Sequence, residues 1–172
     1  MKQALLLQAQ YNQFANKNMF AVLQGAPKDA LYKDCGLYWG SIMQTAEHSL
    51  CSTIAIVFQH FSPFAAKKLD GTEALLGALT PEGKLQSAIF NDLDAFAKLQ
   101  DQADSKVIEL IQSIEDFDSV AVLAFPGIEF KKPRGFLILA FLNHAVHHRG
   151  AIAGALDILK IENDFNGMLG MN

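Results

Sequence analysis

The sequence has few of the features that mark secreted or membrane proteins. Only two of its 172 residues are cysteines, Cys35 and Cys51. Because we find no secretion signal, we expect two free thiols rather than a disulfide. The longest purely apolar run, residues 136–142, is far shorter than the roughly 20 residues needed to span a bilayer. We therefore expect a cytoplasmic protein with no membrane partner.

Basic residues are also scarce. The chain has 14 Lys and Arg against 18 Asp and Glu, and its net charge at pH 7 is −4. Its densest basic runs are the pairs Lys67-Lys68 and Lys131-Lys132. Nucleic-acid binding needs a positively charged patch that these pairs do not supply, so we expect no nucleic-acid partner.

Apolar residues, in contrast, are abundant. Hydrophobic residues make up 51% of the chain and include 13 Phe. This content is enough for the core of one domain over residues 1–172. It is slightly high for a soluble monomer, so some apolar surface is expected between subunits, although a tightly packed monomer explains it nearly as well.

Apolar residues recur at helical spacing in four stretches of the chain. The pattern predicts helices over residues 3–23, 41–61, 87–114 and 135–160, the third with a weak point near 101–105. Ser41 and Gln44 have the form of a capping box at the start of the second helix. Four such helices favour an all-α fold, with an antiparallel four-helix bundle as the expected architecture.

The segments between these helices carry turn-forming residues. We expect an ordered loop over residues 25–40 and a long connection from 62 to 83 with one short helix near 73–76. Alternating apolar residues on both sides of Pro126-Gly127 predict a small β-hairpin before the last long helix. A short terminal segment around 165–169 is expected to close the chain.

Three of the five histidines fall inside residues 143–150, N-H-A-V-H-H-R-G, in the last predicted helix. His144 and His148 are one turn apart on the same face, with Cβ atoms about 5–6 Å from each other. Neutral imidazoles at this spacing can converge on one zinc or nickel ion. A third ligand must then come from elsewhere in the chain.

His48 is the candidate for that third ligand, because it is the one histidine outside the cluster that lies in the middle of a predicted helix. It lies off the apolar stripe of this helix. Its face carries small or weakly polar residues, Thr45, Cys51, Ser52 and Ala55. Such a face either meets solvent or lines a cavity, and the second alternative would suit a metal site.

The remaining polar candidates have other expected roles. His147 lies 100° around its helix from the neighbouring His148, which favours a place at an interface or behind the ligands. His60 is expected at a helix C-terminus, where the helix dipole favours a cation. Cys51 is expected to pack, although it could approach the site. Arg149 either binds an anionic substrate or forms a salt bridge within the fold.

The histidine stretch also carries a family resemblance. Residues 143–150 resemble the N-H-x-x-H-H-R-G-Q motif of the DinB-like (DinB/YfiT) superfamily. Residues 11–16, Y-N-Q-F-A-N, are similar to its Y-N-x-W-A-N helix, and residues 40–48 are similar to its G-S-I-x-x-T-x-x-H segment. The last histidine of that segment is the first metal ligand of the family.

The resemblance implies a four-helix bundle of up-down-down-up connectivity, often a homodimer, with nickel or zinc held by three histidines. Carried over by position, the ligands are His48, His144 and His148. Characterised relatives include transferases and isomerases that use a low-molecular-weight thiol. The resemblance therefore implies a small-molecule substrate or thiol as partner.

Two residues depart from the family pattern. Ala151 stands where the family usually has Gln, and Ser52 stands where relatives often carry an acidic residue. Our leading hypothesis is a metal-dependent hydrolase or thiol S-transferase in which a metal-bound water or thiolate reacts. Because a carboxylate is missing at Ser52, the alternative is a non-catalytic, stress-related bundle protein that binds metal or a small ligand.

Overall fold

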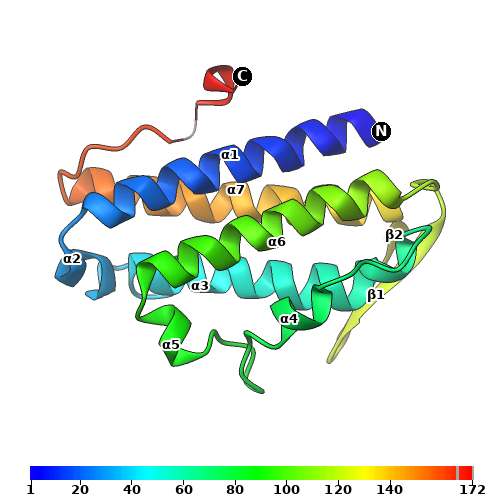
Figure 1. Ribbon diagram of the computed structural model, residues 1–172, viewed down its shortest axis with the longest axis horizontal. Helices are drawn as coiled ribbons and strands as arrows, with labels where there is room; N and C mark the ends of the chain where they lie inside the picture. Colours follow the sequence, from blue (N-terminus) through cyan, green and yellow to red (C-terminus); the bar gives the residue numbers. More distant parts are fainter. Residues whose placement is uncertain (166, 172) are drawn as a thin grey trace.

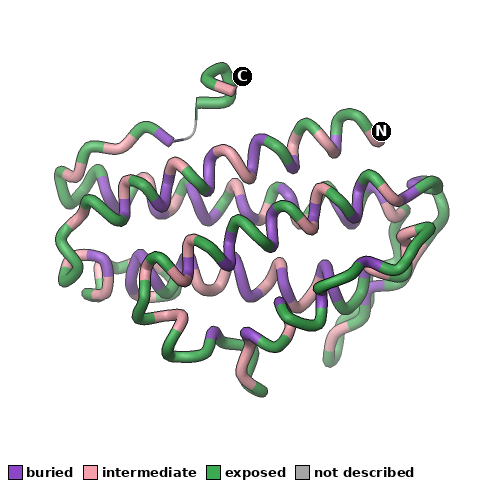
Figure 2. Tube along the Cα trace, viewed as in Figure 1, coloured by how far each residue is buried: buried purple, intermediate pink, exposed green. Residues whose placement is uncertain are grey.

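Four long helical segments run side by side along the molecule (Figure 1). The computed structural model describes residues 1–165 and 167–171. The segments are α1 (Lys2–Gly25), α3 (Ile42–Ser52) with the π-helix η1 (Thr53–Phe61) that continues it, α6 (Leu93–Ser113) and α7 (Arg134–Ile158). Helix α1 packs against α6 and α7, and α3 packs against α7. The buried residues lie on the sides of the helices that face one another (Figure 2).

Helix α6 illustrates how the apolar pattern builds the core. Phe96, Ala103, Val107 and Leu110 recur every three to seven residues and are buried. The predicted weak point at 101–105 is wrong, because the helix is continuous there. The break lies earlier, where the Asp92 carboxylate accepts hydrogen bonds from the backbone N–H groups of Asp94 and Ala95. This N-cap starts α6 and separates it from the short helix α5 (Ser87–Phe90).

Shorter elements occupy the connections. The loop expected over residues 25–40 contains a helix, α2 (Lys28–Tyr32), which the prediction missed. The long connection holds a 3₁₀ turn, η2 (Ser62–Phe64), and then α4 (Thr72–Leu76), which confirms the predicted short helix. At the C-terminal end Phe165 is buried and η3 (Met168–Gly170) follows, whereas Asn166 of the expected terminal segment lies outside the described residues.

The predicted hairpin is confirmed. Strand β1 (Val120–Phe125) pairs antiparallel with β2 (Ile128–Pro133), with Val122 opposite Lys131. Gly127 has φ of +82° in the connecting turn, a conformation that favours glycine. The hairpin leads directly into α7. A mostly helical chain with a small hairpin before its last long helix is therefore the observed architecture.

Within residues 1–165 and 167–171, no helix is both long enough and apolar enough to cross a membrane.

Candidate metal centre

The first part of the site is His48 on α3. The position at which this helix begins is determined by two residues of its first turn. Ser41 Oγ accepts a hydrogen bond from the Gln44 backbone N–H, and Gln44 Oε1 accepts one from the Ser41 backbone N–H, each at 3.1 Å. This is the predicted capping box, which satisfies two free backbone donors of the first turn. His48 follows one turn later, on the part of α3 that packs against α7.

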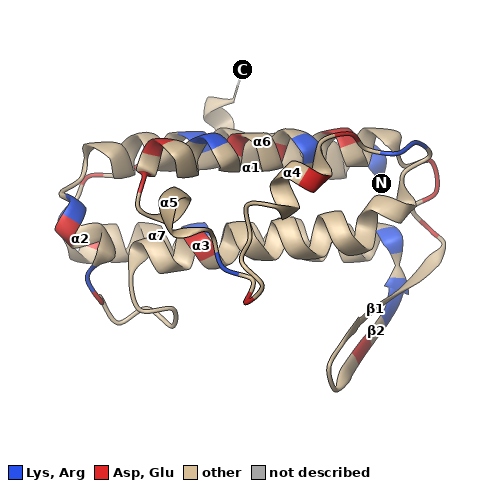
Figure 3. Ribbon diagram, turned by 60° about the horizontal axis from the view of Figure 1, so that its bottom comes forward, with Lys and Arg blue, Asp and Glu red and all other residues tan. Residues whose placement is uncertain are grey.

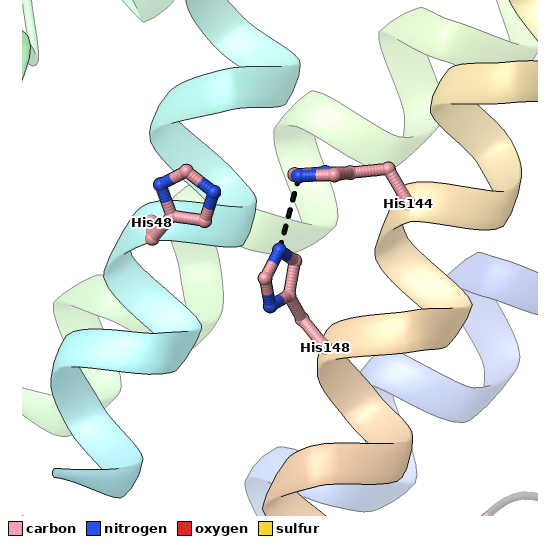
Figure 4. A group of neighbouring side chains, drawn as sticks. All are labelled: His48, His144 and His148. Carbon is pink, nitrogen blue, oxygen red and sulfur yellow. Dashed lines mark hydrogen bonds between the residues drawn. The ribbon is translucent and has the colours of Figure 1, made fainter. Parts of the chain in front are cut away.

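The second part is the pair on α7, and the structure brings it to His48. His144, His148 and His48 each offer a ring nitrogen, and these atoms lie within 4.8 Å of one another. The three rings converge in the space between α3 and α7 (Figure 4). His144 Nε2 and His148 Nε2 are 3.0 Å apart. Residues separated by about 100 positions in the sequence thus form one cluster.

The spacing of these nitrogens fits a metal ion. Ligands at 2.0–2.1 Å in a tetrahedral arrangement lie about 3.3 Å from one another. The 3.0 Å between the two α7 nitrogens is close to that value, and the His48 nitrogen lies within 4.8 Å of both. The His48, His144 and His148 group could therefore hold a divalent ion.

The protonation state of the cluster favours the same conclusion. Burial, followed by the neighbouring His144, lowers the pKa of His48 from 6.5 to about 4. Burial and the other histidines likewise lower the pKa of His148 to about 4, and burial lowers the pKa of His144. The three imidazoles are neutral at pH 7, which is the form that binds metal.

The small-residue face that runs from α3 into η1 lines a pocket of about 380 Å³. Three of the four residues predicted to share the face of His48 line it, namely Cys51, Ser52 and Ala55. Residues 82–84, in the loop between α4 and α5, line it as well. Of the two sequence alternatives, the cavity is confirmed for this part of the face, whereas Thr45 is buried in the core.

Trp39 is a residue of the site that the sequence argument missed. Its indole stacks on the His48 imidazole, with ring centroids 3.8 Å apart and planes 19° from parallel. It also lines the pocket. The available signal was its place two residues before the helix-capping Ser41, which fixes it close to the first turns of α3.

Arg149 points away from the histidines and into the core. Its side chain is only 2% exposed. The guanidinium donates from Nη1 to Asn16 Oδ1 at 3.0 Å and from Nη2 to Asn12 Oδ1 at 2.7 Å. Asn16 Nδ2 in turn donates to the buried Asp104 carboxylate at 2.8 Å. These contacts anchor α7 to α1 and α6, and a role for Arg149 in substrate binding stays a prediction.

The other candidates lie outside the cluster. His147 is exposed, with its ring beside that of His148. His60 is exposed at the end of η1, 6.2 Å from the Phe125 ring. Cys51 is buried, and burial followed by Glu47 raises the pKa of its thiol to about 12. A thiol that stays protonated at neutral pH is a poor nucleophile.

Comparison with known proteins identifies a family to which the sequence is similar. A family model described as the DinB family matches residues 1–159. A search of curated proteins gave no significant match. The matched region contains all three clustered histidines and both asparagines that bind Arg149.

Proposed function

The chain belongs to the DinB family, and we propose that it is a metal-dependent enzyme whose divalent ion is held by His48, His144 and His148. The observation that carries the proposal is the convergence of three neutral ring nitrogens within 4.8 Å. Nickel or zinc suits this donor set, because both accept neutral imidazole. We assign the reaction to the hydrolase or thiol S-transferase type, with a small molecule or a low-molecular-weight thiol as substrate.

Different residues of the chain would have different roles in the proposed site. A divalent ion held by the three histidines would supply Lewis-acid chemistry and would lower the pKa of a water or thiol that it binds. Trp39 holds the His48 ring by stacking on it. Arg149 fixes the position of α7 through Asn12 and Asn16. The pocket beside His48 gives a small molecule access to one side of the cluster.

A second candidate function is a non-catalytic protein that binds metal or a small ligand. Ser52 favours it, because this residue lines the pocket where relatives often carry a carboxylate. A hydroxyl at that place cannot act as a general base near neutral pH. This candidate predicts bound metal without turnover.

We further propose that the four long segments form a four-helix bundle of up-down-down-up connectivity, in one domain over residues 1–172. The packing of α1 on α6 and α7, and of α3 on α7, supports this assignment. So does the long crossover between η1 and α6. We also propose a homodimer, since Phe136 and Leu139 of α7 are 53% and 38% exposed. Light scattering of the purified protein tests the dimer.

The metal proposal is tested on protein purified without a histidine tag from cells grown with nickel and zinc. Elemental analysis should give close to one metal ion per chain. His48→Ala should lose the metal. His147→Ala is the matched control, because it removes a neighbouring but exposed imidazole and should retain it. A metal content near zero in the unaltered protein rejects the proposal.

The reaction type is tested with a panel of electrophiles and esters, each combined with several low-molecular-weight thiols or with water. Turnover that disappears in His48→Ala and persists in His147→Ala supports an enzyme. Stoichiometric metal with no turnover across the panel favours the binding protein instead.

A further inference from the structure

The pocket beside His48 has a charge pattern that the proposed metal site does not explain. Two carboxylates, Glu47 and Glu82, line it together with one ammonium group, that of Lys84. Figure 3 shows acidic residues both on α3 and in the loop between α4 and α5. Within the described residues, neither carboxylate forms an ion pair within 4.0 Å, since the three ion pairs found there lie elsewhere. The pocket is therefore net negative.

Glu47 is held in a defined position inside this pocket. It is half-buried, and its Oε1 accepts a hydrogen bond from the Leu85 backbone N–H at 3.0 Å. In the part of the chain that the structure describes, this is the one hydrogen bond of the Glu47 side chain. One carboxylate oxygen is thus fixed by the loop, and the other remains free to accept a hydrogen bond from a ligand.

The other walls suit the body of a small organic molecule. Trp39 offers an aromatic ring, and Ala55 and Ile56 offer apolar surface. The volume of about 380 Å³ falls in the ordinary range of ligand pockets, roughly 300–1,000 Å³. A half-buried carboxylate binds a charged hydrogen-bond donor more strongly than a neutral one. The face of an aromatic ring attracts a cation.

From this arrangement we propose that the pocket binds a small organic amine in its protonated form, with Glu47 as the anchor of the ammonium group. Glu82 adds negative charge at the rim. The inference rests on the proposed function in one respect. The part of the ligand away from its ammonium group would lie beside His48, which is one of the proposed metal ligands. Glu47 would then supply, from a neighbouring position, the carboxylate that is missing at Ser52.

The test compares ligands that differ only in charge. Benzylamine and benzyl alcohol have nearly the same shape, and each is titrated into the full chain by NMR, both metal-free and loaded with zinc. We expect the amine to bind at least about tenfold more tightly than the alcohol, as for a hydrogen bond to a charged group. Signals of the pocket residues should shift. The preference should persist without metal, because it depends on Glu47.

Glu47→Gln is the decisive variant. The amide oxygen that this substitution leaves can still accept the Leu85 N–H, so the fold is preserved while the charge is lost. The preference for the amine should disappear. Glu129→Gln on the exposed hairpin strand makes the same charge change away from the pocket and should leave the preference intact.

Three outcomes overturn the inference: equal binding of amine and alcohol, no binding of the amine, or a preference that survives in Glu47→Gln. The metal content of the same samples separates this inference from the proposed function. An amine preference in protein that takes up no metal would reject the metal proposal alone. Stoichiometric metal without the preference would reject the amine site alone.

Discussion

Two polar clusters meet on α7 at consecutive residues, His148 and Arg149. Arg149 faces α1, where the side-chain amide oxygens of Asn12 and Asn16 accept hydrogen bonds from its two Nη groups. Asn16 in turn donates a hydrogen bond to Asp104. His148 faces α3, and its Nε2 lies 3.0 Å from Nε2 of His144, which precedes it by one turn on α7, so that at most one proton can lie between the two atoms. Most hydrogen-bonding groups of the first cluster find their partners within the protein, whereas the second cluster brings together three ring nitrogens that could hold a metal ion.

The difference separates stability from function. Buried polar groups that are paired hold a fold in one arrangement, and removal of one partner is costly. Neutral ring nitrogens that converge on one point are the arrangement expected where a cation is bound. Arg149 should therefore matter for folding, and the histidines should matter for metal.

The largest effect is expected on the Arg149 side. Arg149→Met should lower the free energy of unfolding by about 3–5 kcal/mol, because it leaves buried acceptors without their donor. Urea unfolding measures this change. Lys131→Met on the exposed strand β2 is the control and should change stability by less than about 0.5 kcal/mol. A loss below about 1 kcal/mol for Arg149→Met would contradict the structural role.

The next effect concerns the histidine side and should appear only with metal. At a free zinc concentration 100 times its Kd, the unaltered protein should gain about 2.7 kcal/mol of stability by mass action. His48→Ala should lose this gain while the metal-free protein keeps its stability within about 1 kcal/mol. Thermal unfolding with zinc and with a chelator measures both. The comparison fails if the variant retains the gain.

Acidification should affect the two clusters in opposite directions. The pKa of His48 is lowered by burial from 6.5 to about 4, so the unfolded state binds more protons in this range and stability falls as pH drops through it. Burial raises the pKa of Asp104 from 3.8 to about 7, so the folded state binds the proton first and stability rises as pH drops from about 7 to about 4.

Asp104→Asn should remove this second contribution. In metal-free protein between pH 5 and pH 8, the unaltered chain should lose on the order of 2–3 kcal/mol relative to the variant as pH rises. Urea unfolding at several pH values gives the two slopes. Identical slopes would show that Asp104 does not titrate in this range.

The smallest effect is expected at Trp39. Trp39→Ala removes the ring stacked on His48, an interaction of about 0.5–1.5 kcal/mol, so metal affinity should fall about twofold to tenfold. Competition with a coloured chelator measures it. Tyr38→Ala changes an adjacent aromatic residue that is 92% exposed and should have less effect. Equal losses in both variants would remove any special role for the stacking.

The sequence was informative where the signal is local. The capping box at Ser41, the hairpin around Gly127 and the helical spacing of His144 and His148 depend on neighbours within a few residues. Each was confirmed. The place of His48 beside them followed from its position within a helix and from the family resemblance.

Features that depend on contacts between residues far apart in the sequence could not be predicted from local patterns. The hydrogen bonds of Arg149 join residues more than 130 positions apart, and no periodicity indicates them. The break before α6 was misplaced because the apolar pattern continues across Asp92, whose capping hydrogen bonds decide the boundary. The pocket lined by Trp39 and Glu47 is another such feature, because the loop at Glu82, which also lines it, is distant from both residues in the sequence.

The π-helix η1 has a consequence for how this chain can change in length. Its hydrogen bonds span one residue more than those of an α-helix, so a turn there can close to α-helix when a residue is deleted. A deletion between 53 and 61 could then be absorbed locally, leaving His48 and the preceding turns of α3 in register. In α7 a single deletion between His144 and His148 would turn one ligand away by about 100°. Natural or engineered variation in length should therefore be tolerated in η1 and not between the two α7 histidines.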